Sequence, residues 1–198
     1  MSFKALAFCA MAAALILALG STTAVAQDNI FALGYYSNAH TTGAPDSALR
    51  LVNDGYVSDS SPAGDLCASI YVFDSKEELS ECCSCKVTPN GILSLSVNTN
   101  LTNNPLTPEI LKRGVIKVVS SSPTSGVCDA RNVSPQIGIR GWLTHVQKGT
   151  GTAFSQTEEE LLDSSFGSSE QTDLAEDCTV LMEIGSGHGS CSCTDSGQ

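Results

Sequence analysis

Cysteine is the residue type in this sequence whose number and spacing most clearly suggest specific chemistry. Three cysteines stand in the segment Cys82-Cys83-Ser84-Cys85, and two more stand near the end in Cys191-Ser192-Cys193. Clustered thiolates are good ligands for Zn²⁺ and Cu⁺, and His188 is close enough in sequence to join them. Cysteines also form disulfides, which persist in oxidising compartments. The same residues therefore support two chemistries, and the compartment decides between them.

The first 26 residues have the pattern of a secretory signal peptide. Lys4 provides a positive charge, an apolar run extends from Ala5 to Leu19, and Ala24-Val25-Ala26 fits the small-residue motif that precedes a cleavage site. We expect cleavage between Ala26 and Gln27. Residues 27–198 would then form a single domain, secreted or periplasmic, with no membrane span.

The cysteine count favours disulfides over a metal site. Cleavage would remove Cys9 and leave eight cysteines, an even number that predicts disulfides in an exported chain. A metal thiolate cluster would need reduced cysteines, so we expect no bound metal and no cofactor. The predicted disulfide cysteines are Cys67, Cys82, Cys83, Cys85, Cys128, Cys178, Cys191 and Cys193.

The spacing within the two clusters predicts that they are bonded to each other. Cys191 and Cys193 have one residue between them, too short a loop for easy pairing at the usual Cβ separation of about 3.8 Å. Cys82 and Cys83 are similarly poor partners for one another. Each cluster must therefore pair elsewhere, and each is the other's richest source of sulfur. Cys67, Cys128, Cys178 and the remaining cysteine of the CCSC segment would then supply the other two bridges, in pairings that stay open.

The sequence contains no recognisable catalytic motif, and we assign no catalytic residue. There is no Gly-x-Ser-x-Gly elbow, and the three histidines, His40, His145 and His188, stand outside known motifs. The glycine-rich segment 185–189 lacks the preceding strand and following helix of a dinucleotide loop. The three glutamates at 158–160 are explained by the dipole of a predicted helix start.

The charge distribution excludes two classes of partner. The net charge is −11, and no Lys or Arg follows Lys148. A phosphate backbone or an anionic membrane surface would be repelled by this chain, so we expect no nucleic acid partner.

The segment Leu66–Phe73 is predicted to be the central strand. It is apolar on both faces, which indicates a strand covered on both sides and paired with two neighbours. Ser75 and Glu78 fit a capping box, so a short helix is expected to follow and to present Cys82 and Cys83. Further strands are predicted at 28–37, 49–51, 93–97, 115–119 and 137–146, where Gly138 and Gly141 suggest a bulge or a close backbone approach.

Two more helices are expected in the last third of the chain. One would begin near Ser155 or Thr157 and include Leu161 and Leu162. The other would bury Leu174, Cys178, Leu181 and Met182 and end at Gly185. The pattern predicts a mainly β fold, an antiparallel Ig-like β-sandwich with two or three short helices; an α+β fold is the alternative.

The chain resembles cysteine-rich exported bacterial proteins in its signal peptide and in the segments LCASIYVF, ECCSC and GSGHGSCSC. This resemblance implies no activity. Because no catalytic motif is present, we favour a secreted, disulfide-stabilised binding or structural module that is not an enzyme. Its partner would be a protein or a glycan outside the cytoplasm. A secreted hydrolase with an acid/His site is the alternative.

The even cysteine count makes a direct prediction. The mature protein, purified without reductant, should contain no free thiol. Alkylation under denaturing, non-reducing conditions followed by mass spectrometry should find no labelled cysteine, and two or more labelled cysteines per chain would contradict the prediction.

Overall fold

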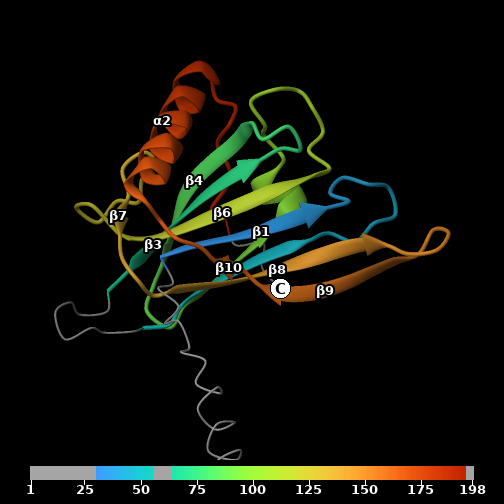
Figure 1. Cartoon of the computed structure of the whole chain (residues 1–198), viewed down its shortest axis with the longest axis horizontal. Helices are drawn as coiled ribbons and strands as arrows, with labels where there is room; N and C mark the ends of the chain where they lie inside the picture. The colour runs from blue at the N-terminus through green and yellow to red at the C-terminus, as the bar shows by residue number, and fades with distance from the viewer. Residues whose placement is uncertain (1–29, 56–63, 195–198) are drawn as a thin grey trace, which may run out of the picture.

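The computed structural model describes residues 30–55 and 64–194, so the predicted signal peptide and its cleavage site lie outside the described residues. The described chain is mainly β, as the sequence predicts, with two antiparallel sheets and one α-helix (Figure 1). None of the described helices is long and apolar enough to cross a lipid bilayer.

The two sheets contain ten strands of the described chain. The larger sheet has the order β10-β1-β6-β3-β4, with β7 paired to β6, and the smaller has the order β5-β2-β8-β9. The Ig-like arrangement itself is not confirmed by this order. The elements are β1 (Phe31–Ser37), β2 (Ala48–Asn53), β3 (Leu66–Phe73), β4 (Leu79–Val87), β5 (Ile92–Ser96), the π-helical turn η1 (Val97–Leu101), β6 (Arg113–Ser122), β7 (Ser134–Pro135), β8 (Ile139–Lys148), β9 (Phe154–Glu160), β10 (Leu162–Asp163) and the helix α2 (Ser168–Ile184).

Strand β3 is interior, as predicted, and it joins two hydrophobic cores. It pairs antiparallel with β4 on one side and with β6 on the other. Ala68, Ile70 and Val72 point into the core between the two sheets. Tyr71 points to the opposite face, where it packs in a second core with side chains of α2. The strand is apolar on both faces because a sheet covers one face and a helix covers the other.

The predicted helix after β3 is wrong, because the chain turns back as a hairpin. The Asp74 carboxylate accepts hydrogen bonds from the backbone N–H groups of Lys76 (2.7 Å) and Glu78 (3.0 Å), and Glu77 adopts a positive φ of 69°. These contacts close a tight turn instead of capping a helix. Strand β4 begins at Leu79, so Cys82 and Cys83 lie on opposite faces of a strand and not on one helical face.

The predicted helix near Thr157 is also wrong. Residues 154–160 form β9, an edge strand paired with β8. Glu158 and Glu160 form ion pairs with Arg50 and Arg140, while Glu159 lies 3.7 Å from the ring of His145. The alternation of a strand places Glu159 on the opposite face from Glu158 and Glu160, which separates charges that a single helix turn would crowd.

Four disulfides join the eight predicted cysteines in the pairs Cys67–Cys128, Cys82–Cys178, Cys83–Cys191 and Cys85–Cys193. The predicted bond between the CCSC segment and the closing CSC is therefore confirmed, and it is double. The C-terminal segment 189–194, here called the strap, runs beside β4 with a parallel bridge between Cys82 and Ser190. The strap covers the outer edge of β4, an edge that would otherwise offer free backbone groups to another chain.

The C-terminal helix follows the prediction closely. Helix α2 buries Leu174, Cys178 and Leu181 against the larger sheet and ends at Gly185, whose N–H donates to the Leu181 carbonyl. Its start lies at Ser168, a little earlier than the predicted apolar face. In Figure 1 the helix lies beside β4, and its buried residues share the second core with Tyr71 of β3 and Val119 of β6.

The chain crosses from the smaller sheet to the larger one at Leu161. This buried residue stands between β9 and β10, and its side chain packs against two glycines. A Cβ on Gly34 would lie 2.7 Å from Leu161 Cδ2, and one on Gly141 would lie 2.6 Å from Leu161 Cδ1. The sequence predicted a bulge or a close backbone approach at Gly141; the structure shows instead that the side chains of Leu161 and Leu51 fill the space that a side chain would need.

We expect Gly141→Ala to lower the free energy of unfolding by about 1–3 kcal/mol, because the new methyl group overpacks the corner at Leu161. Urea denaturation would measure the change. Gly149→Ala is the matched control, since the nearest atom to its Cβ lies 3.5 Å away. Combining Gly141→Ala with Leu161→Val should recover part of the loss, and a purely additive double variant would contradict this account.

Candidate functional site

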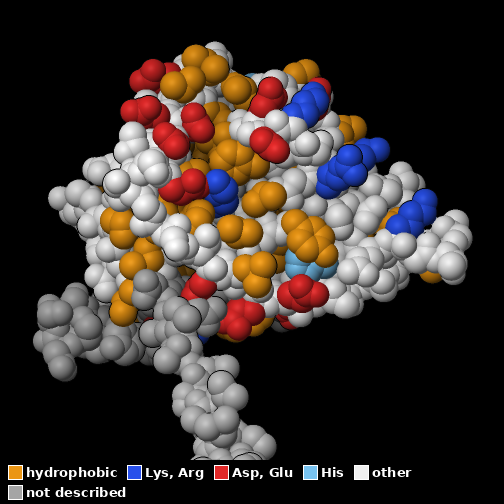
Figure 2. Space-filling view, viewed as in Figure 1, with side chains coloured by type: hydrophobic (Ala, Val, Ile, Leu, Met, Phe, Trp, Pro, Cys, Tyr) orange, Lys and Arg blue, Asp and Glu red, His pale blue; other side chains and the backbone are white. Residues whose placement is uncertain are grey.

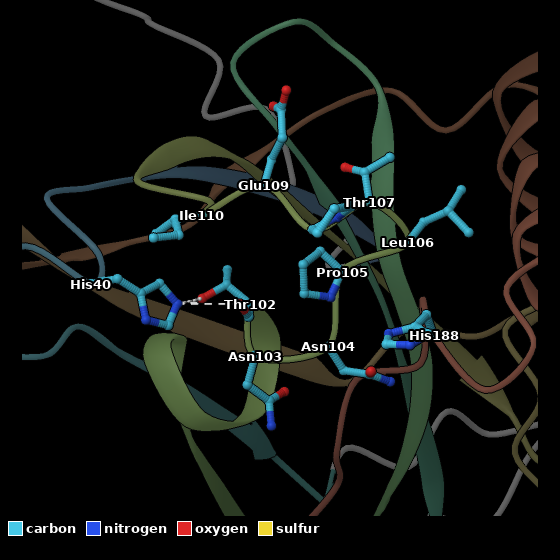
Figure 3. Close-up of a pocket in the computed structure, with 11 residues that line it drawn as sticks. His40, Thr102, Asn103, Asn104, Pro105, Leu106, Thr107, Glu109, Ile110 and His188 are labelled. Atoms are coloured by element: carbon cyan, nitrogen blue, oxygen red, sulfur yellow. Dashed lines mark hydrogen bonds between the residues drawn. The ribbon is translucent and has the colours of Figure 1, made fainter.

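A cavity of about 490 Å³ opens where three distant segments meet (Figure 3). One wall is the loop 102–110, which connects η1 to β6. His40 comes from the loop after β1, and His188 comes from the turn after α2. Figure 3 shows the two histidines on opposite sides of the cavity, with Thr102, Asn104 and Pro105 between them.

The hydrogen bonds of Thr102 show which ring nitrogen of His40 carries a proton. The Thr102 hydroxyl donates to the Val97 carbonyl at 2.6 Å, so its oxygen is an acceptor toward the His40 ring. His40 Nε2 lies 2.8 Å from this oxygen and 3.2 Å from the Thr102 carbonyl, and therefore carries a proton. Because both groups donate protons, His40 is not placed as a general base toward the Thr102 hydroxyl.

Asn104 fastens the cavity wall to the strap and to β4. Its side-chain amide donates to the backbone carbonyls of Gly187 (2.9 Å) and Ser190 (3.3 Å). Its backbone carbonyl accepts the N–H of Gly189 (2.7 Å). These bonds hold the turn that carries His188. Among the described residues, the His188 ring has no hydrogen-bond partner, so both its nitrogens are available to a ligand.

The rest of the lining is mostly apolar, with Asn103 and Thr107 as further polar residues and Glu109 as its one carboxylate. Pro105, Leu106, Pro108 and Ile110 contribute apolar surface, and Ile110 is exposed. The carboxylate of Glu109 points away from the other lining residues in Figure 3 and is paired with Lys76 at 2.8 Å. The lining contains no serine, and its one carboxylate is occupied by a cation.

A second hollow of about 310 Å³ adjoins the first, because Leu106 lines both. Its apolar residues are Leu79, Leu106, Val180, Leu181 and Ile184, and its acidic residues are Glu77, Glu78 and Asp177. Figure 2 shows that acidic side chains gather over α2, which forms one side of this hollow. The two hollows together make an apolar surface with negative charge at its border.

Behind the cavity wall lies a buried carboxylate. Glu81 on β4 is fully buried, and its Oε1 accepts the backbone N–H of Asn104 at 2.9 Å. Its Oε2 has no hydrogen-bond partner among the described residues. Burial disfavours the charged form and raises the pKa of Glu81 from 4.5 to about 7. The same burial raises the pKa of the Tyr36 phenol, which donates to the Phe73 carbonyl.

The structure separates Cys82 and His188 from the other residues that the sequence offered as metal ligands. Cys82 points toward α2 and bonds Cys178, whereas Cys83 and Cys85 bond the strap. His188 lines the cavity instead of joining the sulfur atoms. His145 lies apart from this cavity in β8, where its ring stacks on Tyr35 with centroids 4.1 Å apart.

The loop 102–110 is not among the candidate sites that the sequence offers. The apolar residues Leu106 and Ile110, together with Pro105 and Pro108, were the available signal. Their meaning depends on His40 and α2, which only the folded chain brings beside them.

Comparisons with known proteins give no further guide to the site. No protein-family model, no curated protein and no solved structure matches the chain.

The buried Glu81 predicts a specific pH dependence of stability. Its folded-state pKa is raised, so the folded protein holds the proton more tightly and stability should fall as the pH rises from about 4.5 to about 7. The loss should be on the order of 3 kcal/mol and should not grow above pH 7. Glu81→Gln should remove it, since an amide oxygen still accepts the Asn104 N–H.

Urea denaturation between pH 4 and pH 8 would test this. Wild type and Glu81→Gln should differ little at pH 4 and most at pH 8, with the variant more stable. Glu78→Gln removes an exposed carboxylate three residues earlier and serves as the control. Parallel profiles for wild type and Glu81→Gln would contradict the assignment.

Proposed function

We propose that this protein is an exported, disulfide-stabilised binding module that recognises a protein partner through the two hollows joined at Leu106. One observation carries the proposal: the hollows of about 490 and 310 Å³ share the lining residue Leu106, and their apolar residues adjoin there. Ligand sites typically combine such apolar lining with a few polar groups. The polar groups here are the rings of His40 and His188.

The shape of the surface supports a peptide segment as the ligand. Two hollows on either side of Leu106 suit an extended or helical segment that places one apolar side chain in each. A small molecule would fill one hollow and leave the other exposed. The protein partner is therefore favoured here over the glycan that the sequence also allowed.

The charge around the surface supports a basic ligand. Glu77, Glu78 and Asp177 border the second hollow, and the whole chain carries a net charge of −11. Complementary charge accelerates association and selects against acidic partners. The ligand class that fits is a segment with two apolar anchors and flanking Lys or Arg residues.

The alternative, a hydrolase with an acid/His site, has weaker support. The lining of the cavity includes His40, His188 and Glu109, but the two histidines lie on opposite sides, Glu109 pairs with Lys76, and the Thr102 hydroxyl donates to a backbone carbonyl. Nucleophilic catalysis needs a nucleophile within reach of a free base. The described lining supports binding more directly than it supports this chemistry.

Selection of a random peptide display library on the mature protein should enrich peptides that combine Lys or Arg with Leu, Ile or Phe. Ile110→Ser or Ile184→Ser should weaken their binding about 10-fold, since each removes apolar contact area worth roughly 1–2 kcal/mol. Fluorescence anisotropy with the synthesised peptides would measure the dissociation constants. Raising the salt concentration should weaken binding further.

Ile92→Ser is the matched control. Ile92 is 60 % exposed, against 61 % for Ile184, and lines neither hollow. The proposal fails if the enriched peptides lack basic residues, or if the Ile92 variant loses as much affinity as the other two.

A further inference from the structure

The two bridges between β4 and the strap gather four sulfur atoms in one cluster. Cys83 Sγ lies 4.0 Å from Cys85 Sγ, although these residues belong to different disulfides. The sulfur atoms of Cys83, Cys85 and Cys193 all lie within 4.8 Å of one another. Cys191 Sγ is bonded directly to Cys83 Sγ and supplies a fourth sulfur atom beside these three.

The cluster follows from strand geometry. Both segments have the pattern Cys-x-Cys, and residues two apart on a strand point to the same face. The parallel bridge between Cys82 and Ser190 sets the register, which places Cys83 opposite Cys191 and Cys85 opposite Cys193. The Cα–Cα distance is 5.3 Å in both pairs.

We propose that, once these two bridges are reduced, the four cysteines form a tetrathiolate site for Zn²⁺. Structural zinc sites are tetrahedral with Zn–S bonds of about 2.3 Å, which places the sulfur atoms about 3.8 Å apart. The separation of 4.0 Å between Cys83 and Cys85 is already close to that value. Small rotations of the four side chains would complete the tetrahedron after the S–S bonds open.

Backbone hydrogen bonds would keep the strap in place when the S–S bonds open. Cys82 N–H donates to the Gly189 carbonyl at 2.9 Å, and Cys191 N–H donates to the Cys82 carbonyl at 3.3 Å. Farther along the strap, Ser192 N–H donates to the Asn100 carbonyl at 2.9 Å. The Asn100 side chain donates to the Thr194 carbonyl at 3.0 Å. The two Cys-x-Cys segments are therefore held opposite each other independently of sulfur chemistry.

Burial gives the cluster a closed inner side and an open outer side. Cys83, Cys85 and Cys191 are buried, whereas Cys193 is exposed. A reductant can therefore reach the Cys85–Cys193 bond first, through Cys193. The four cysteines supply all four ligands, as in structural zinc sites that have no open position.

The redox step uses an external dithiol. Each bridge takes two electrons and two protons from one dithiol, which closes to its own disulfide, so two dithiols convert the two bridges into four thiols. Binding of one Zn²⁺ then releases up to four protons, because the ligands are thiolates. The oxidised protein has no thiolate at this position and should not bind the metal there.

Zinc titration of the full mature protein, with and without a phosphine reductant, would test the proposal. The phosphine takes up the oxygen of water as it reduces each bridge, and the two protons of that water go to the thiols. The reduced protein should bind one Zn²⁺ per chain, and Co²⁺ in its place should give the absorption bands of a tetrahedral cobalt thiolate. The oxidised protein should bind none. Failure of the reduced, folded protein to bind Zn²⁺ would overturn the proposal.

Two double variants distinguish this cluster from the other cysteines. Cys85→Ser/Cys193→Ser removes two of the four ligands and should weaken zinc binding by roughly 100-fold or more. Cys67→Ser/Cys128→Ser also removes one bridge but leaves the cluster intact, so it should keep the wild-type affinity. Equal losses in the two variants would overturn the assignment.

Circular dichroism would follow the fold of the reduced protein. If reduction alone unfolds it, one equivalent of Zn²⁺ should restore the β spectrum, since metal binding and folding are coupled at such sites. A reduced chain that stays unfolded in excess zinc would overturn the proposal as firmly as a folded one that does not bind it.

Discussion

The alternation of side chains along β4 is the constraint on which the rest of the structure depends. Cys82 faces α2 and bonds Cys178, while Cys83 and Cys85 face the other side and bond the strap. One strand therefore anchors the helical layer through one face and the C-terminal segment through the other. Two adjacent cysteines serve both purposes because neighbouring strand residues point in opposite directions.

The two strap bridges differ in what they contribute to stability. Each spans 108 residues, and the first to form closes a loop worth about 4–5 kcal/mol in the chain-entropy model. With that loop closed, the second closes only a small ring of a few residues and contributes roughly half as much. Stability alone therefore gives less reason for the second bridge than for the first, whereas both pairs of cysteines are needed to supply four sulfur atoms.

The strap also connects the sulfur cluster to the candidate binding surface. Asn104 bonds the strap, forms part of the cavity wall and donates its backbone N–H to the buried Glu81. The position of His188 depends on the same turn that precedes the strap. A structural change at the two bridges would therefore be transmitted to the cavity through a short chain of hydrogen bonds. A change in the charge of Glu81 would be transmitted to the cavity through Asn104 as well.

Features that depend on local pattern could be predicted from the amino-acid sequence. It predicted the mainly β fold, the interior strand Leu66–Phe73, the apolar face of α2 and the link between the two cysteine clusters, because side-chain periodicity and loop length are properties of short segments. The hairpin at Asp74 and the strand at 154–160 depended on partners far along the chain, so local capping signals gave the wrong answer for both. The cavity could not be predicted in this way. Its lining residues His40, the loop 102–110 and His188 meet through tertiary packing that no local pattern encodes.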